Sequence, residues 1–277
     1  MLKKLIKHEW KDTWLIGTIC SIIVLAFAVI GLFIFNEDVW QKSTARSDMA
    51  SNLTMLTMSL YLMTFFIGLT ATAFIVKYYF FWRYYKNLFT DQGYLMNTLP
   101  VKCTDLINAK LIVAVIWHYI INIVIGLGII ILIMCFSSSI IPSHEEARFW
   151  QEILELYQEI VLSKIGAHIP FLIGISLCGL LAPVVNVLLM FTAVGIGQLA
   201  KKNKFLFSVL ILIGFMFCRR TIAYFISMPI ALVMDTRVTS TNAVDAASFI
   251  FVFIFTGAII VLYLLNKYFL KKKLNLE

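Results

Sequence analysis

The sequence predicts an all-α integral membrane protein with six transmembrane helices. Hydrophobic residues make up 61% of the 277 residues and charged residues only 14%, whereas soluble domains average about a quarter charged residues. The mean hydropathy is +0.91. Apolar runs of about 20 residues, the length that a membrane-spanning helix needs, recur along the chain. We therefore expect a single transmembrane domain that covers residues 1–277.

Six apolar runs are long enough to be spans. They cover about residues 14–35, 53–81, 111–136, 169–199, 204–220 and 249–270. The apolar stretch 221–234 is too short for a crossing of its own. We expect a re-entrant or interfacial segment there, on the outer side before the sixth span.

The distribution of basic residues supports six crossings. With both termini in the cytoplasm, 16 of the 23 Lys and Arg residues fall on the inner side and 7 on the outer side, which agrees with the positive-inside bias. A seventh crossing would move the basic C-terminal residues outside. The net charge of +8 suits membrane lipids with anionic headgroups and gives no reason to expect nucleic acid as a partner.

Two amphipathic stretches accompany the spans. In residues 1–13, apolar residues recur every three to four positions and lysines fall opposite them. We expect an interfacial helix in the inner headgroup layer; the alternative is a frayed basic tail. The outer connection 137–168 carries an apolar stripe from Phe149 to Ile165, typical of an amphipathic helix. It either caps an exit or meets a second subunit, or it is a solvated helix that rests on lipid.

Motifs for catalysis or metal binding are missing from the sequence. The phosphate-binding pattern G-x-x-x-x-G-K-[ST] does not occur, the four histidines are dispersed, and the five cysteines show no C-x-x-C spacing. We expect no catalytic residue, no metal site and no cofactor on this chain. By itself the chain is therefore not expected to be an enzyme.

Polar residues inside spans are costly in lipid and usually face a protein interior or a cavity. His118 and Asn122 lie four positions apart in the third span and share a helical face, while Asn186 lies in the fourth span. Arg219 and Arg220 close the fifth span toward the outer side. We take these five residues as candidates for a substrate pathway. The alternatives are interhelical hydrogen bonds for the first three and snorkelling to lipid phosphates for the arginines.

The inner connection 83–106 interrupts the apolar sequence. Its first residues give a short helix an apolar, aromatic face, and Asp91-Gln92-Gly93 would end that helix, with Gly93 free to take a positive φ. A short helix with exposed aromatic side chains offers a contact to a cytosolic partner.

Residues 84–111, "YYKNLFTDQGYLMNTLPVKCTDLINAKL", resemble the inner loop of type-2 ABC transporter permeases of Gram-positive bacteria, which commonly runs L-F-x-D-E-G-Y-L-x-x-T-L-P-V. Gln92 stands where that family usually has an acid. The resemblance implies a coupling helix that docks on a separate cytosolic ABC ATPase subunit, which would bind ATP and Mg. It also implies that two permease chains pair, as a homodimer or a heterodimer. The residues assigned to ATPase coupling are Tyr84, Tyr85, Lys86, Asn87, Leu88, Phe89, Thr90, Asp91, Gln92, Gly93 and Tyr94.

The expected function is that of a permease subunit of an ATP-driven ABC exporter in the bacterial plasma membrane. The expected cargo is amphipathic or hydrophobic, a peptide toxin or bacteriocin first and a drug or lipid second. One alternative is a secondary transporter or channel that works without ATP, although the expected spans hold no Asp or Glu to carry a coupling proton. The other is a membrane scaffold or immunity protein that transports nothing.

Overall fold

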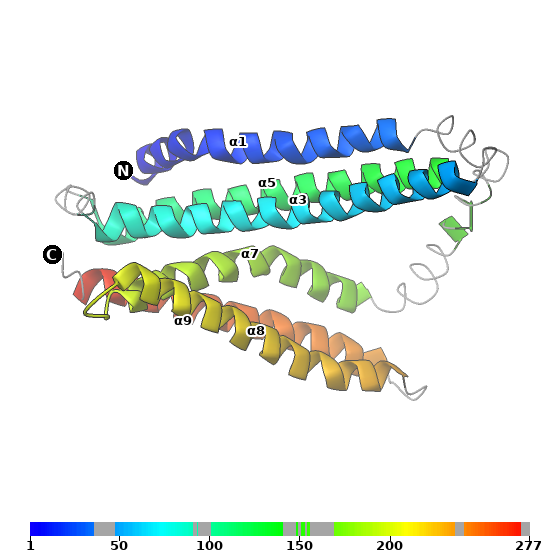
Figure 1. Ribbon diagram of the computed structural model, residues 1–277. Coiled ribbons are helices and arrows are strands. Elements are labelled where there is room, and N and C mark those ends of the chain that lie inside the picture. The colour runs from blue at the N-terminus through cyan, green and yellow to red at the C-terminus, as the bar shows by residue number, and fades with distance from the viewer. Residues whose placement is uncertain are drawn as a thin grey trace. The chain divides into compact units, whose positions relative to one another are not determined.

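The computed structural model describes residues 1–35, 48–90, 93, 101–140, 148, 151–152, 154–155, 169–235 and 241–272. All regular elements in these residues are α-helices (Figure 1). They are α1 (Leu2–Ile34), α3 (Asp48–Phe89), α5 (Cys103–Ile140), α7 (Ile169–Gly197), α8 (Lys204–Asp235) and α9 (Thr241–Lys272).

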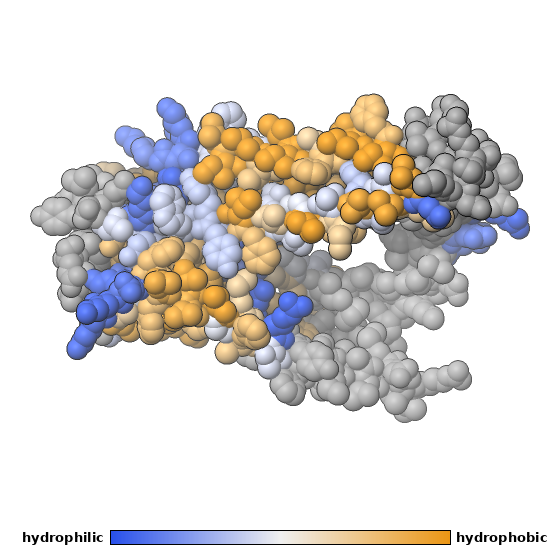
Figure 2. Space-filling view, viewed as in Figure 1, coloured by the Kyte–Doolittle hydropathy of each residue, from blue (hydrophilic) through white to orange (hydrophobic). Residues whose placement is uncertain are grey.

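Five described helices have stretches long and apolar enough to cross a membrane. These stretches are Leu2–Ile34, Met55–Phe89, Cys103–Cys135, Ser176–Gly197 and Phe249–Lys271. The prediction of an all-helical, multi-pass membrane protein is confirmed at this level, and a sixth crossing stays a prediction. The surface agrees, because Figure 2 shows broad apolar areas along the helices, with hydrophilic residues gathered mainly near helix ends.

The course of α8 corrects the expectation for the outer side. Lys204–Asp235 is one helix of 32 residues, so residues 221–234 continue it and do not form a separate re-entrant segment. The arginine pair that suggested an end to the span is made of good helix formers. The two arginines therefore end the apolar run but do not end the helix.

The N-terminal end of α1 and the C-terminal end of α3 differ from expectation for the same reason. Residues 1–13 belong to the continuous helix Leu2–Ile34 and are not a separate interfacial helix. Residues 84–89 are the last turns of α3 and not a separate short helix. Neither boundary carries a Gly or Pro that would end a helix. The amphipathic helix expected in 137–168 lies largely outside the described residues.

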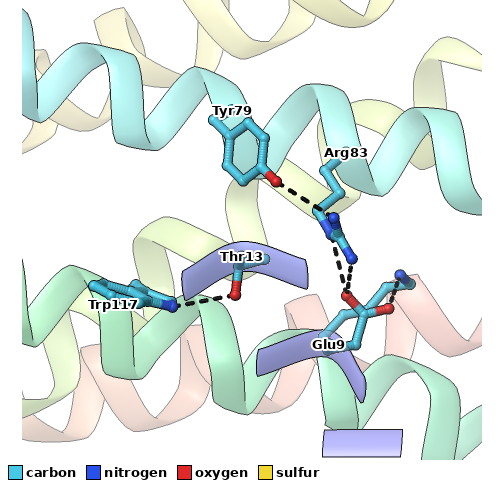
Figure 3. Close-up of polar contacts among 6 residues, drawn as sticks. Glu9, Thr13, Tyr79, Arg83 and Trp117 are labelled. Atoms are coloured by element: carbon cyan, nitrogen blue, oxygen red, sulfur yellow. Dashed lines mark hydrogen bonds and ion pairs between the residues drawn. The ribbon is translucent and has the colours of Figure 1, made fainter. Parts of the chain in front are cut away.

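The helices divide into two compact units. Unit 1 comprises Met1–Trp10, Tyr79–Ile116 and Val161–Glu277, and unit 2 comprises Lys11–Tyr78 and Trp117–Ile160. The core of unit 2 is apolar and draws on α1, α3 and α5. Within it the Tyr61 hydroxyl donates a hydrogen bond to the Phe27 carbonyl over 2.6 Å. The Trp117 indole N–H donates to the Thr13 hydroxyl over 3.2 Å (Figure 3).

In unit 1, α7 packs against both α8 and α9. The turn between α7 and α8 is tight, because a Cβ on Gly197 would overlap the side chain of Ser208. Asn203 has a left-handed φ of 52° there, a conformation that Asn tolerates better than most residues. Asn266 of α9 is 1% exposed, and its amide donates to the Leu188 carbonyl of α7 over 3.3 Å. A buried polar bond therefore fixes α9 against α7 at this level.

Candidate functional site at the end of α3

Three charged side chains meet in unit 1, one each from α1, α3 and α5 (Figure 3). The Glu9 carboxylate accepts hydrogen bonds from Arg83 Nη2 over 3.0 Å and Nε over 3.2 Å. Its other oxygen accepts from Lys110 Nζ over 2.5 Å. The remaining Arg83 amino group donates to the Tyr79 hydroxyl over 3.3 Å. We refer to Glu9, Arg83 and Lys110 as the ion triad.

The ion triad is largely removed from solvent. The exposed fractions of the side chains are 8% for Glu9, 14% for Arg83 and 5% for Lys110. Buried charges are tolerated when they are paired and hydrogen-bonded, and here one carboxylate serves two cations. The ion triad therefore ties the N-terminal part of α1 to the end of α3 and the start of α5.

The ion triad was not among the sites predicted from the sequence, although one signal was present. Glu9 follows Leu2 by seven positions and Leu5 by four, so it lies on the apolar face of the N-terminal helix. An acid on such a face needs a partner inside the protein. The pattern does not say which basic residues provide it.

A cavity of about 10 Å³ lies beside the ion triad, about the space that one water molecule occupies. The aromatic side chains of Phe80, Tyr84 and Phe191 line it together with the three charged residues. This cavity is too small for a cofactor or a cargo molecule. We therefore assign a structural role to the ion triad and look elsewhere for a ligand site.

The last turns of α3 are anchored by their own aromatic residues. Tyr84 is 2% exposed, and its ring stacks on Phe191 of α7 with centroids 3.7 Å apart and planes at 7°. Leu88 has no exposed surface. Tyr85 is half-buried and lies edge-on to Phe205 of α8, with centroids 5.1 Å apart. The side chains of Tyr84 and Leu88 are therefore enclosed within unit 1, and their assignment to ATPase coupling stays a prediction.

The other described residues assigned to coupling at the end of α3 are less buried than Tyr84 and Leu88. Lys86, Asn87, Phe89 and Thr90 are half-buried, so part of each side chain reaches the surface of unit 1. The Lys86 ammonium lies 4.9 Å from the centre of the Trp82 ring, a cation–π contact within one helix. Asp91, Gln92 and Tyr94 lie outside the described residues.

Gly93, which follows the end of α3, does not have the backbone conformation expected of it. Its φ is not positive, so the expected left-handed conformation is wrong. The glycine is needed for close approach, because a Cβ here would lie 2.4 Å from the Leu88 carbonyl oxygen. Its N–H donates to the Thr90 carbonyl over 2.7 Å. Gly93 therefore packs directly against the end of α3.

The pathway candidates fall into two groups. Arg219 of α8 donates a hydrogen bond from Nη1 to the side-chain oxygen of Asn186 on α7, so two candidates of unit 1 meet. Arg219 and Arg220 are both exposed. In unit 2, His118 is buried whereas Asn122 is exposed, so only one of that pair faces the packed interior.

The chain's own residues provide no metal centre in the part that the structure describes. No group of three or more His, Cys, Asp or Glu side chains is close enough there to hold an ion. The five cysteines are free thiols.

Comparison with known proteins identifies no family for this chain. No family model matches it, and neither a curated protein nor a solved structure matches it. The functional interpretation therefore depends on the residues and the geometry described above.

Proposed function

We propose that the chain is the membrane-spanning permease subunit of an ATP-driven exporter. The observation that carries the proposal is the sequence L-F-T-D-Q-G-Y-L-M-N-T-L-P-V at 88–101, which begins in the last two residues of α3. In this proposal a separate cytosolic ATPase binds ATP and Mg and docks on this stretch. Two permease chains pair in the bacterial plasma membrane, with their termini in the cytoplasm. The cargo is amphipathic or hydrophobic, such as a peptide toxin or bacteriocin, a drug or a lipid.

The anchoring of α3 supports the proposal. Tyr84 stacks on α7 and Arg83 is bonded to Glu9 of α1, so the end of α3 is held by two other helices of unit 1. A push on the following turn would reach α1, α5 and α7 through these contacts. Mechanical coupling to an ATPase needs such a rigid base, because a loosely attached loop would absorb the movement.

The burial pattern changes which side chains would touch the ATPase. Tyr84 and Leu88 are enclosed, whereas Phe89 is only half-buried. The contact is therefore assigned to Phe89 and to the residues that follow it, among which Tyr94 is the next aromatic side chain. Truncation of an aromatic side chain at an interface centre costs about 2–4 kcal/mol, which is about 30- to 1,000-fold in affinity.

The test is co-purification with the ATPase whose gene neighbours that of the permease. Tyr94→Ala and Phe89→Ala should lower ATPase retention and cargo-stimulated ATP hydrolysis, while helix content and membrane insertion stay unchanged. Lys202→Ala, in the exposed turn between α7 and α8, is the control and should retain both. Normal retention and hydrolysis in both aromatic variants would contradict the proposal. Cargo transport by the permease alone in vesicles without ATP would favour a secondary transporter instead.

A further inference from the structure

Two adjacent arginines are exposed on α8 after a long apolar stretch. The residues from Phe205 to Cys218 carry no charge, and Arg219 and Arg220 follow them inside the same helix. The question is what such a pair contacts when the helices of unit 1 are surrounded by lipid.

The contact with Asn186 fixes the depth of Arg219. Asn186 lies at the middle of the candidate span Ser176–Gly197, and its side-chain oxygen accepts a hydrogen bond from the Arg219 guanidinium. The guanidinium therefore lies beside the centre of that span. A charged side chain at the bilayer centre is costly, and such residues almost always face a protein interior or a water-filled cavity.

Among the residues whose side chains the structure describes, α7, α8 and α9 place no carboxylate beside this charge. α7 contains no Asp or Glu, the single acid of α8 is its last residue, Asp235, and the candidate span Phe249–Lys271 of α9 contains none. Among the described residues neither arginine forms an ion pair. A guanidinium has five N–H donors, and Asn186 accepts from one nitrogen of Arg219. Among the described residues, the other N–H donors of the pair meet no acceptor, so they can bind a ligand.

The described residues that precede the arginine pair in α8 are open and apolar. Five residues before Arg219, a Cβ on Gly214 would meet nothing within 4 Å, and Phe217 is 73% exposed. A ligand here can therefore place a charged group on the arginines and an apolar chain along α8. Guanidinium groups bind phosphate and carboxylate with two parallel hydrogen bonds.

We propose that Asn186, Arg219 and Arg220 form a binding site for the anionic headgroup, phosphate or carboxylate, of a membrane amphiphile. Asn186 positions Arg219, and the two arginines bind the headgroup. Only the identification of the amphiphile as cargo rests on the proposed function. Binding itself needs neither an ATPase nor a transport cycle.

The experiment uses Cys218, which is exposed beside the pair. A fluorescent probe is attached to it after the other four cysteines are replaced by alanine, and the full chain is reconstituted in phosphatidylcholine vesicles. Brominated phosphatidylglycerol, brominated phosphatidylcholine or a brominated fatty acid is added at equal mole fraction. We expect both anionic lipids to quench the probe more strongly than the neutral one. Arg219→Gln with Arg220→Gln should reduce their quenching to the level of phosphatidylcholine.

A matched control separates the site from general charge attraction. Lys201→Gln with Lys202→Gln removes the same charge from the exposed turn between α7 and α8 and should keep the preference for anionic lipid. Equal quenching by anionic and neutral lipid in the unsubstituted chain would overturn the proposal, whether the arginines are covered by a second chain or face water. A preference that survives in the double glutamine variant would overturn it as well.

Inorganic phosphate distinguishes a headgroup from a free anion. At matched ionic strength, phosphate and chloride should leave the lipid preference equally intact. If phosphate alone abolishes it, the site takes free phosphate from water and the assignment to an amphiphile is wrong. No ATPase is present in these vesicles, so failure of the proposed export function would not change the result, and loss of the lipid preference would not refute ATPase coupling.

Discussion

Glu9 is the residue whose replacement tests the ion triad most directly. Glu9→Gln keeps the size and one carbonyl oxygen of the side chain but removes its charge. The two cations that Glu9 joins, Arg83 and Lys110, have exposed side-chain fractions of only 14% and 5%. The variant therefore leaves two buried positive charges close together without their shared carboxylate.

The expected loss of stability depends on which charged side chains remain buried after the substitution. Removal of one partner from a buried ion pair typically destabilises a protein by about 3–5 kcal/mol, and we expect Glu9→Gln to fall in this range. Lys110→Met keeps most of the apolar stem and leaves Glu9 bonded to Arg83 over 3.0 Å. That variant loses a charged hydrogen bond worth about 1.5–3 kcal/mol, but it also removes the desolvation penalty of a buried cation. We therefore expect Lys110→Met to cost clearly less than Glu9→Gln.

The assay is unfolding of the purified chain in detergent, followed by tryptophan fluorescence and helical circular dichroism. Glu9→Gln should lower the midpoint more than Lys110→Met, and the double variant should be more stable than Glu9→Gln alone, because one buried cation has been removed. The difference should persist at about 1 M salt, where interactions between exposed charges are screened beyond about 3 Å but those between buried charges are screened much less. Equal effects of the two single variants, or a neutral Glu9→Gln, would refute the reasoning.

Two further predictions concern packing. In unit 2, a Cβ on Gly17 would lie 2.2 Å from the buried Trp117 ring whereas one on Gly126 would meet nothing within 4 Å, so Gly17→Ala should cost about 1–3 kcal/mol and Gly126→Ala should be neutral or stabilise by up to about 1 kcal/mol. Equal unfolding midpoints of these two variants would contradict the packing described. In unit 1, Tyr84→Ala and Phe191→Ala should each cost about 3–5 kcal/mol. Their double-mutant cycle in the same assay should give a coupling of about 0.5–1.5 kcal/mol, and strict additivity would show that the rings do not stack.

The positions of the helices follow from hydropathy, but their ends do not. Apolar runs locate the stretches that suit lipid, which is why four of the expected spans lie within observed helices and the other two, 14–35 and 169–199, end one and two residues past α1 and α7. Hydrogen bonding of the backbone continues past the apolar run wherever no breaker stands. The helix α3 therefore continues to Phe89, and α8 continues through Arg219 and Arg220 to Asp235.

Contacts between distant residues were the part of the site that the sequence could not predict. Glu9 is separated from Arg83 by 74 positions and from Lys110 by 101, and only tertiary packing brings them together. The opposite holds for Asn186 and Arg219, each of which was identified as a polar residue in an apolar span. Their contact arises because α7 packs against α8.

The two groups of cations in unit 1 lie in different environments, and this difference distinguishes a structural role from a functional one. Arg83 and Lys110 are buried against a carboxylate, so their charge is compensated within the chain and holds helices together. Arg219 and Arg220 remain exposed, with a neutral amide as the described partner of Arg219. An uncompensated charge in an apolar environment is costly, so a role in stability alone does not explain it. The second group is therefore where a ligand should be sought, and the first is where the movement of α3 would be transmitted.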